Sequence, residues 1–136
     1  DARKCISYLT IEFNGVIPEP LRPAMGNRIY GCDDCQIACP WNKFAQQTAE
    51  PDFSPRHALD AISLLECFSW DEATFLSKTE GSAIRRIGFE CWRRNVAVAL
   101  GNAPSNPEIS AALNAALDDP SSLVREHVRW ALAQHS

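Results

Sequence analysis

Three closely spaced cysteines constrain this chain more than any other feature of its sequence. Cys32, Cys35 and Cys39 follow the spacing CxxCxxxCP in the segment GCDDCQIACPWN. In bacterial ferredoxins, cysteines close together in the sequence wrap one iron–sulfur cluster, and a cysteine followed by proline reaches the neighbouring cluster. The spacing therefore predicts iron–sulfur ligation, and Cys5 is a further candidate ligand.

Zinc is the main chemical alternative for these cysteines. A CxxC turn also begins zinc knuckles and ribbons, and Cys5 could complete a four-thiolate zinc site. Zinc sites usually pair two CxxC turns, however, and this sequence contains one. Its three histidines, His57, His127 and His135, all lie in the later part of the chain. The pattern thus favours iron–sulfur ligation over zinc.

Disulfides are a second alternative, because six cysteines could form three bridges. That arrangement is typical of oxidised, secreted and loop-rich chains. Here Cys67 and Cys91 fall within amphipathic helical patterns, so we predict that both are buried as small apolar groups.

Composition indicates a folded chain without a membrane segment. Of its 136 residues, 46% are apolar, but no apolar run approaches the ~20 residues that span a bilayer. The first residues lack a secretory pattern, so we expect the protein in the cytoplasm. We also expect it to be a monomer. The formal charge of −4 argues against attraction of the whole surface to nucleic acid, although a local basic patch acts within a Debye length of about 8–10 Å.

The pattern changes near Glu50, after which the sequence reads as successive helices. We predict a partial ferredoxin-type iron–sulfur segment over 1–52 and a helical domain over 53–136, which makes the fold mainly α. Apolar residues at three-residue steps predict a helix over about 57–67. Ser69 and Glu72 stand in a capping-box relation that predicts the next helix start.

Three more helices are predicted downstream. One should run from Ser82 to a stop near Gly101, and the others should begin at the Asn-Pro and Asp-Pro steps of Asn106 and Asp119. The segments RRNVAVALGN and REHVRWALAQ share Arg, Val, Ala and Leu at a constant offset, which is typical of a HEAT-like repeat. Two copies leave a small irregular helical bundle as the alternative.

Three segments together resemble the epoxyqueuosine reductase family. They are RKCISYLTIE, GNRIYGCDDCQIACPWNKFA and SAIRRIGFECWRRNVAVALGN, which begin at Arg3, Gly26 and Ser82. The cysteine segment alone would fit a ferredoxin, but the arginine-rich segment that ends in ALGN would not. The resemblance implies a cobalamin-dependent enzyme with two 4Fe-4S clusters that reduces epoxyqueuosine to queuosine at the tRNA wobble position. Its partners would be that tRNA and an electron donor.

The resemblance also implies roles for individual residues. Cys5, Cys32 and Cys35 are expected to ligate one 4Fe-4S cluster, and Cys39 is expected to ligate the other. Ser7 is expected to approach cobalamin, with a hydroxyl at a helix start or core edge as the alternative.

The family pattern also contains parts that this sequence lacks. Two four-iron clusters need about eight thiolates, and only four are offered here. The remaining ligands, the cobalamin-binding region and the catalytic residues are therefore expected to precede Asp1. We expect this chain to be the C-terminal part of the enzyme.

Four arginines lie within ten residues of one another, at Arg85, Arg86, Arg93 and Arg94. On one continuous helix a step of seven or eight residues returns to nearly the same face. We therefore predict a positive stripe that contacts the tRNA backbone, with structural ion pairing as the alternative.

Two other functions remain open on the sequence alone. A different corrinoid iron–sulfur reductase, such as a reductive dehalogenase, should lack the basic helical tail. A ferredoxin-type electron carrier fused to a helical interaction module would not be an enzyme.

Overall fold

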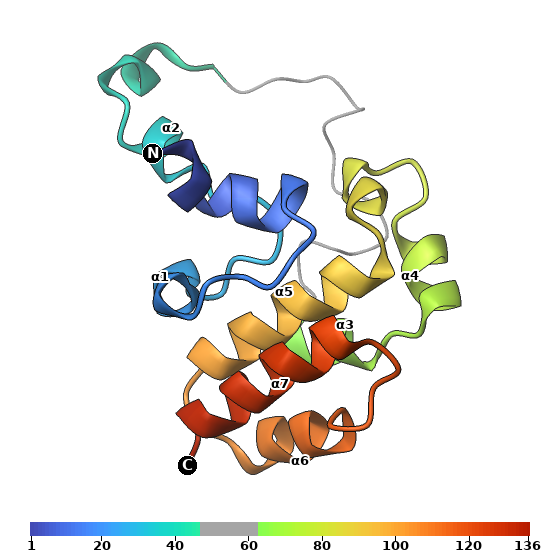
Figure 1. Cartoon of the computed structure of the whole chain (residues 1–136). Helices are drawn as coiled ribbons and strands as arrows, with labels where there is room; N and C mark the ends of the chain where they lie inside the picture. Colours follow the sequence, from blue (N-terminus) through green and yellow to red (C-terminus); the bar gives the residue numbers. More distant parts are fainter. Residues whose placement is uncertain (47–62) are drawn as a thin grey trace.

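The structure is a computed structural model that describes residues 1–46 and 63–136. Figure 1 shows short helices in the first range and longer ones in the second, with no strand in either. The prediction of a mainly α fold is therefore confirmed. The predicted domain boundary and most of the predicted helix over 57–67 lie outside the described residues, and the division into two domains stays a prediction. No helix in the described ranges is long and apolar enough to cross a membrane.

The C-terminal part is built from α5 (Phe89–Asn102), α6 (Pro107–Ala115) and α7 (Ser122–Gln134). Arg93 pairs with Asp119 near the starts of α5 and α7, and Gly101 meets Ala131 near their ends. The two helices therefore lie side by side and run in the same direction, while α6, which connects them in sequence, packs against α7 (Figure 1). This arrangement fits the predicted HEAT-like repeat, which stays a prediction.

The caps of these helices were only partly predictable. Asn106 caps α6 as expected, because its side chain accepts a hydrogen bond from the Glu108 amide. Helix α7 begins later than predicted, because Ser121 is its N-cap. The Asp119 side chain instead accepts a hydrogen bond from the Ser121 amide, at 2.9 Å. Gly101 does not stop α5, which ends one residue later.

Two short helices precede this part, α3 (Leu64–Ser69) and α4 (Glu72–Lys78). The predicted capping box at α4 is wrong, because Ser69 closes α3 by donating to the Glu66 carbonyl. Asp71 caps α4 instead, with its carboxylate 2.7 Å from the Thr74 amide. The capping side chain stands directly before the helix, as N-cap geometry requires.

The predicted helix from Ser82 to Gly101 is two elements. A 3-10 helix, η6 (Ala83–Ile87), is followed by α5, and Gly88 separates them with φ of 81°. Such a positive φ suits glycine and ends the first helix. The first two arginines of the predicted stripe therefore lie on a different element from the last two.

The N-terminal part consists of short turns. In chain order these are η1 (Ala2–Lys4), η2 (Tyr8–Glu12), η3 (Glu19–Leu21), α1 (Arg22–Met25), α2 (Asp34–Ile37) and η4 (Pro40–Phe44). η2 is a π-helix, a rare form that often marks functional sites.

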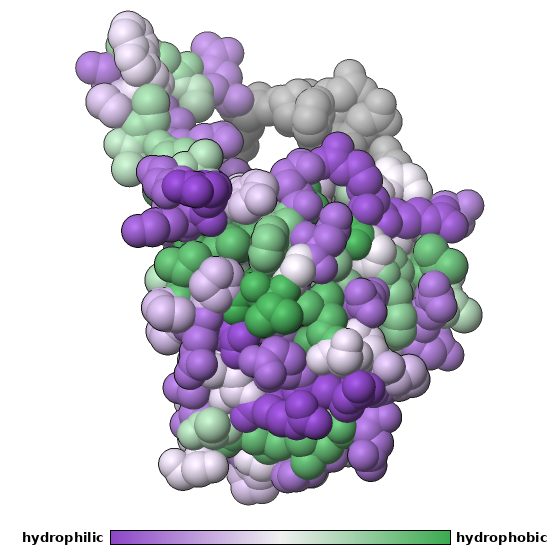
Figure 2. All heavy atoms as spheres, in the orientation of Figure 1, coloured by the Kyte–Doolittle hydropathy of each residue, from purple (hydrophilic) through white to green (hydrophobic). Residues whose placement is uncertain are grey.

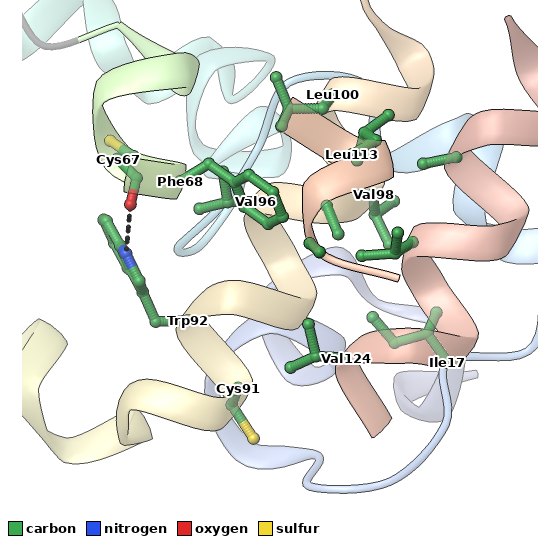
Figure 3. Close-up of a cluster of buried hydrophobic side chains, with 14 of the residues drawn as sticks. Ile17, Cys67, Phe68, Cys91, Trp92, Val96, Val98, Leu100, Leu113 and Val124 are labelled. Atoms are coloured by element: carbon green, nitrogen blue, oxygen red, sulfur yellow. Dashed lines mark hydrogen bonds between the residues drawn. The ribbon is translucent and has the colours of Figure 1, made fainter. Parts of the chain in front are cut away.

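One continuous core joins the two described ranges. Leu9, Ile17 and Met25 are fully or almost fully buried and pack with the apolar faces of α5 and α7. Figure 3 shows part of this cluster, including the hydrogen bond from Trp92 Nε1 to the carbonyl of Cys67, at 3.3 Å. The prediction that Cys67 and Cys91 are buried is confirmed. Burial raises the pKa of the Cys67 thiol to about 11, which suits an inert core thiol.

Candidate iron–sulfur site

Cys5 lies exposed between η1 and η2. Hydrogen bonds from the backbone amides of Tyr8 and Ser7 hold the pKa of its thiol below the ordinary value. The thiolate is the form that binds metal, so these amides favour the state a ligand needs. The Ser7 hydroxyl also lowers the pKa of Cys5, which gives this half-buried serine a role beside the thiol.

Cys32 lies in the loop that follows Gly31, whose φ is 73°. Arg28 forms an ion pair with Asp34 across this loop at 2.6 Å. The hydrogen bond from Arg28, and a further one with Cys32, hold the pKa of the Asp34 carboxyl below its usual range. The ion pair of Arg28 and Asp34 thus joins the two ends of the loop that carries Cys32.

Cys35 lies within α2 and Cys39 directly precedes η4. The side-chain amide of Asn42 donates to the carbonyl of Ile37, at 3.1 Å, and also to that of Gln36. Asn42 therefore folds the chain back over the turn that carries Cys39. This explains locally why asparagine follows the CPW sequence.

The end of this region carries exposed apolar side chains. Ile37, Trp41 and Phe44 are each more than 60% exposed, and the rings of the last two lie 5.5 Å apart. In Figure 2 this lobe stands away from the body of the molecule, at the upper left.

The thiols are separate in this structure. All six cysteines are free in this structure. Among residues 1–46 and 63–136, no three His, Cys, Asp or Glu side chains are grouped as a site for a metal ion.

A buried polar network, which sequence reasoning missed, holds the segments of Cys5 and Cys32 together. The side-chain amide of Asn95 donates to the carbonyls of Thr10 and Ile29, both at 2.9 Å. The Thr10 hydroxyl in turn accepts from the Gly31 amide at 2.9 Å. Asn95 lies on α5, so the central helix fixes both cysteine-bearing segments. The available signal was a polar residue directly before the apolar run VAVAL, on the same helix.

Arg94 is part of the same network and cannot contact RNA from its observed position. Its side chain is fully buried and donates to three carbonyls, those of Leu9, Phe13 and Gly15, at 2.7–3.0 Å. Its two other N–H groups point to Asn95 Oδ1. All five donors of the guanidinium are thus used inside the protein.

The prediction of one arginine stripe is therefore wrong. Arg93 is also mostly buried, because it pairs with Asp119 at 3.0 Å and donates to the Phe68 carbonyl at 2.8 Å. Of these four arginines, only Arg85 and Arg86, on η6, are exposed. Arg86 forms an ion pair with Glu12 at 2.7 Å, which places the basic turn beside the end of η2.

Comparisons with known proteins agree with the cysteine pattern. Residues 1–42 match a family described as 4Fe-4S double cluster binding domain, which confirms the iron–sulfur prediction at the level of the domain. The chain is 63% identical over 135 residues to the epoxyqueuosine reductase of Xanthomonas campestris pv. campestris, covering 99% of this chain and 38% of that protein. It is 61% identical to that of Escherichia coli K12, covering 98% of this chain and 35% of that protein. The chain thus spans little more than a third of these relatives.

Solved structures of epoxyqueuosine reductases resemble this chain as well. A crystal structure of epoxyqueuosine reductase with a tRNA-Tyr epoxyqueuosine-modified tRNA stem loop has a TM-score of 0.89 at 28% identity, covering 98% of this chain and 36% of that one. An epoxyqueuosine reductase structure from Bacillus subtilis has a TM-score of 0.84 at 28% identity, covering 99% and 36%. The resemblance stated from the sequence is confirmed.

Proposed function

We propose that this chain, which belongs to the epoxyqueuosine reductase family, is the cluster-bearing and helical part of an enzyme that reduces epoxyqueuosine to queuosine in a tRNA anticodon. Loss of the epoxide oxygen as water consumes an electron pair and a pair of protons. A domain for two 4Fe-4S clusters fits that demand, because clusters deliver electrons. The observation that carries the proposal is the identity of over 60% across almost the whole chain, cysteine segment and helices together.

The family resemblance implies which cysteines bind which cluster. Cys5, Cys32 and Cys35 would bind one cluster and Cys39 the other, because a cysteine followed by proline crosses to the neighbouring cluster. The donor set fits: all four of these free thiols lie in the matched segment, and the amides around Cys5 favour its thiolate.

Cobalamin would be held mainly by parts of the enzyme outside this chain. When bound, it would supply the reducing centre that meets the epoxide. Ser7 is the residue of this chain proposed to approach it. Its hydroxyl also serves the Cys5 thiol, so this serine would stand at the border between cluster and corrinoid.

The tRNA would meet this chain at the exposed turn of Arg85 and Arg86. Arginine contacts to phosphate give sequence-independent affinity and position the RNA. The turn adjoins η2 through the ion pair between Arg86 and Glu12, so RNA bound there would lie near the segment that follows Cys5. A relative's crystal structure contains a modified tRNA stem loop, which supports RNA as the partner.

The activity is tested by the queuosine content of tRNA in a deletion strain that carries the full-length gene. The wild-type gene should restore queuosine, and Cys32→Ser should leave epoxyqueuosine in its place. An unchanged epoxyqueuosine level with the wild-type gene would reject the reductase and favour a corrinoid enzyme of another kind or an electron carrier.

The ligand assignment is tested by iron analysis and electron paramagnetic resonance of the anaerobically reconstituted full-length protein. The wild type should hold about eight irons. Cys39→Ser should abolish the signal of a different cluster from the one lost in Cys32→Ser or Cys35→Ser. Loss of the same cluster in all three variants would reject the crossed assignment.

A further inference from the structure

We propose that Thr10 and Asn95 are positioning residues that set the separation of Cys5 and Cys32 as two ligands of one cluster. This rests on the proposed function, in which those two cysteines share a cluster. Neither residue touches the thiols, and both would act through the backbone on either side of them.

The Thr10 hydroxyl joins the neighbours of both cysteines. It donates to the carbonyl of Ile6, the residue after Cys5, at 2.8 Å. It accepts from the amide of Gly31, the residue before Cys32, at 2.9 Å. Thr10 is fully buried, so water cannot replace either bond. One hydroxyl thus fixes the distance between two ligand segments far apart in the sequence.

The local helix is built around this hydroxyl. The Phe13 amide bonds to the Tyr8 carbonyl at 3.0 Å, five residues back, which makes η2 a π-helix with Thr10 at its centre. π-turns are rare and cost regular hydrogen bonding, so they persist where they serve a site. Here the irregular turn lies between the Cys5 segment and the loop of Cys32.

Asn95 joins the same two segments through a second pair of hydrogen bonds. Its two N–H groups bond to the carbonyls of Thr10 and Ile29, one on each segment, and it is fully buried. Its Oδ1 is held by Arg94, which also donates to the Leu9 carbonyl at 2.8 Å. Hydrogen bonds from α5 therefore hold both cysteine-bearing segments.

A fixed separation matters because a cluster binds its thiolates at set positions. Groups that orient metal ligands from outside the first coordination sphere typically change metal affinity about 10–100-fold when they are mutated. A structural role alone predicts lower stability with an unchanged cluster. A positioning role predicts an altered cluster in a protein that is still folded.

The test compares Thr10→Val with Thr10→Ser in the reconstituted full-length protein. Valine keeps the shape of threonine but loses the hydroxyl, whereas serine keeps the hydroxyl. We measure iron release to a chelator and the paramagnetic signals of the reduced clusters, with far-UV circular dichroism as the folding control. We expect Thr10→Val to release iron from one cluster about tenfold faster and to change its signal. Thr10→Ser should stay within about twofold of the wild type.

Asn95→Asp provides a second variant that does not depend on Thr10. It keeps an oxygen for Arg94 but removes both donors, so it should also accelerate iron release and alter the same cluster. If both folded variants release iron at the wild-type rate with unchanged signals, the positioning role is rejected.

The cysteine variants separate this failure from failure of the ligand assignment. Cys5→Ser and Cys32→Ser should each lose that same cluster. If they do while the positioning variants match the wild type, only the positioning proposal falls. If Cys5→Ser or Cys32→Ser keeps both clusters, the shared-cluster assignment falls and takes the positioning proposal with it.

Discussion

Gly101 of α5 lies so close to Trp130 of α7 that a Cβ atom at position 101 would stand 2.6 Å from Cζ3 of the indole. The same atom would lie 2.9 Å from the Cα of Ala131, which belongs to the backbone. The two parallel helices therefore meet where one of them has no side chain. Their closeness holds α5, and the network that Asn95 carries, against the core.

Gly101→Ala should lower the free energy of unfolding by about 1–3 kcal/mol, because an added methyl group has no space at this contact. Helix propensity alone predicts the opposite, a gain of about 1 kcal/mol on replacing glycine by alanine. Unfolding by denaturant, followed by circular dichroism, measures the difference.

Ala111→Gly is the matched control, since position 111 is exposed in the middle of α6. It should cost only about 1 kcal/mol, from helix propensity. A more stable Gly101→Ala protein would mean that the helices can separate without cost.

His127 makes the stability of the protein depend on pH. It is fully buried, its Nε2 accepts from the Ile17 amide at 3.1 Å, and its Nδ1 donates to the Leu123 carbonyl at 2.7 Å. Burial lowers its pKa to about 4 from 6.5, so the folded protein holds this histidine neutral. The unfolded chain takes up the proton first, and stability should fall as pH drops from 6.5 towards 4. The full loss is about 3 kcal/mol.

His127→Gln cannot titrate and should therefore remove this part of the pH dependence. Thermal unfolding at pH 7.5, 6.0 and 5.0 measures it for both proteins. We expect the wild type to lose more stability than the variant over this range. Equal losses would mean that His127 is already solvated or charged in the folded protein.

Arg93 should prove to be a structural residue. It is 14% exposed, pairs with Asp119, which is 12% exposed, and lies over the ring of Phe68 at 4.5 Å. Removing one partner of a buried ion pair typically costs about 3–5 kcal/mol, because the other charge stays buried. Arg93→Ala should therefore lower the unfolding temperature sharply, while the double variant Arg93→Ala/Asp119→Ala should recover part of the loss. No change in the single variant would return Arg93 to the set of possible RNA contacts.

The parts of the fold that could be predicted depend on local chemistry. The cap at Asn106 was predicted correctly because it depends only on neighbouring residues. Asn106 precedes a proline, and its side chain accepts a hydrogen bond from the first turn of the helix it caps. The cap of α4 was predicted wrongly because two residues able to cap a helix, Ser69 and Asp71, stand close together in the sequence. The sequence alone does not show that Ser69 closes α3 instead. The burial of Cys67 and Cys91 followed from helical periodicity in the same way.

The parts that could not be predicted depend on tertiary contacts. The arginine pattern assumed one helix, but Gly88 breaks it, and nothing in the spacing distinguishes the exposed Arg85 from the buried Arg94. Arg94 is buried because carbonyls of a segment about 80 residues earlier need donors. The meeting of Thr10 with Asn95 is likewise invisible without the fold.

Arg85 and Arg86 should carry the tRNA contact of this chain. Arg86 pairs with Glu12, but both side chains are at least 60% exposed, and an exposed ion pair contributes little, so the guanidinium can turn to a phosphate. Removing an arginine that binds a phosphate should lower the salt slope of binding by about one unit and cost roughly 1 kcal/mol. Arg85→Ala/Arg86→Ala should therefore weaken tRNA binding by about tenfold or more. The measurement is binding by the full-length protein across a salt series.

Arg129→Ala is the control, because it removes one exposed positive charge from α7 rather than from η6. It should leave the salt slope nearly unchanged. Iron content, measured in parallel, should stay at the wild-type value in both proteins, since η6 carries no cysteine. If the double variant binds tRNA with the wild-type slope, the exposed turn is a solvated surface and the RNA is held by other parts of the enzyme. If it loses iron as well, the pair of Arg86 and Glu12 supports η2, and the effect on RNA is indirect.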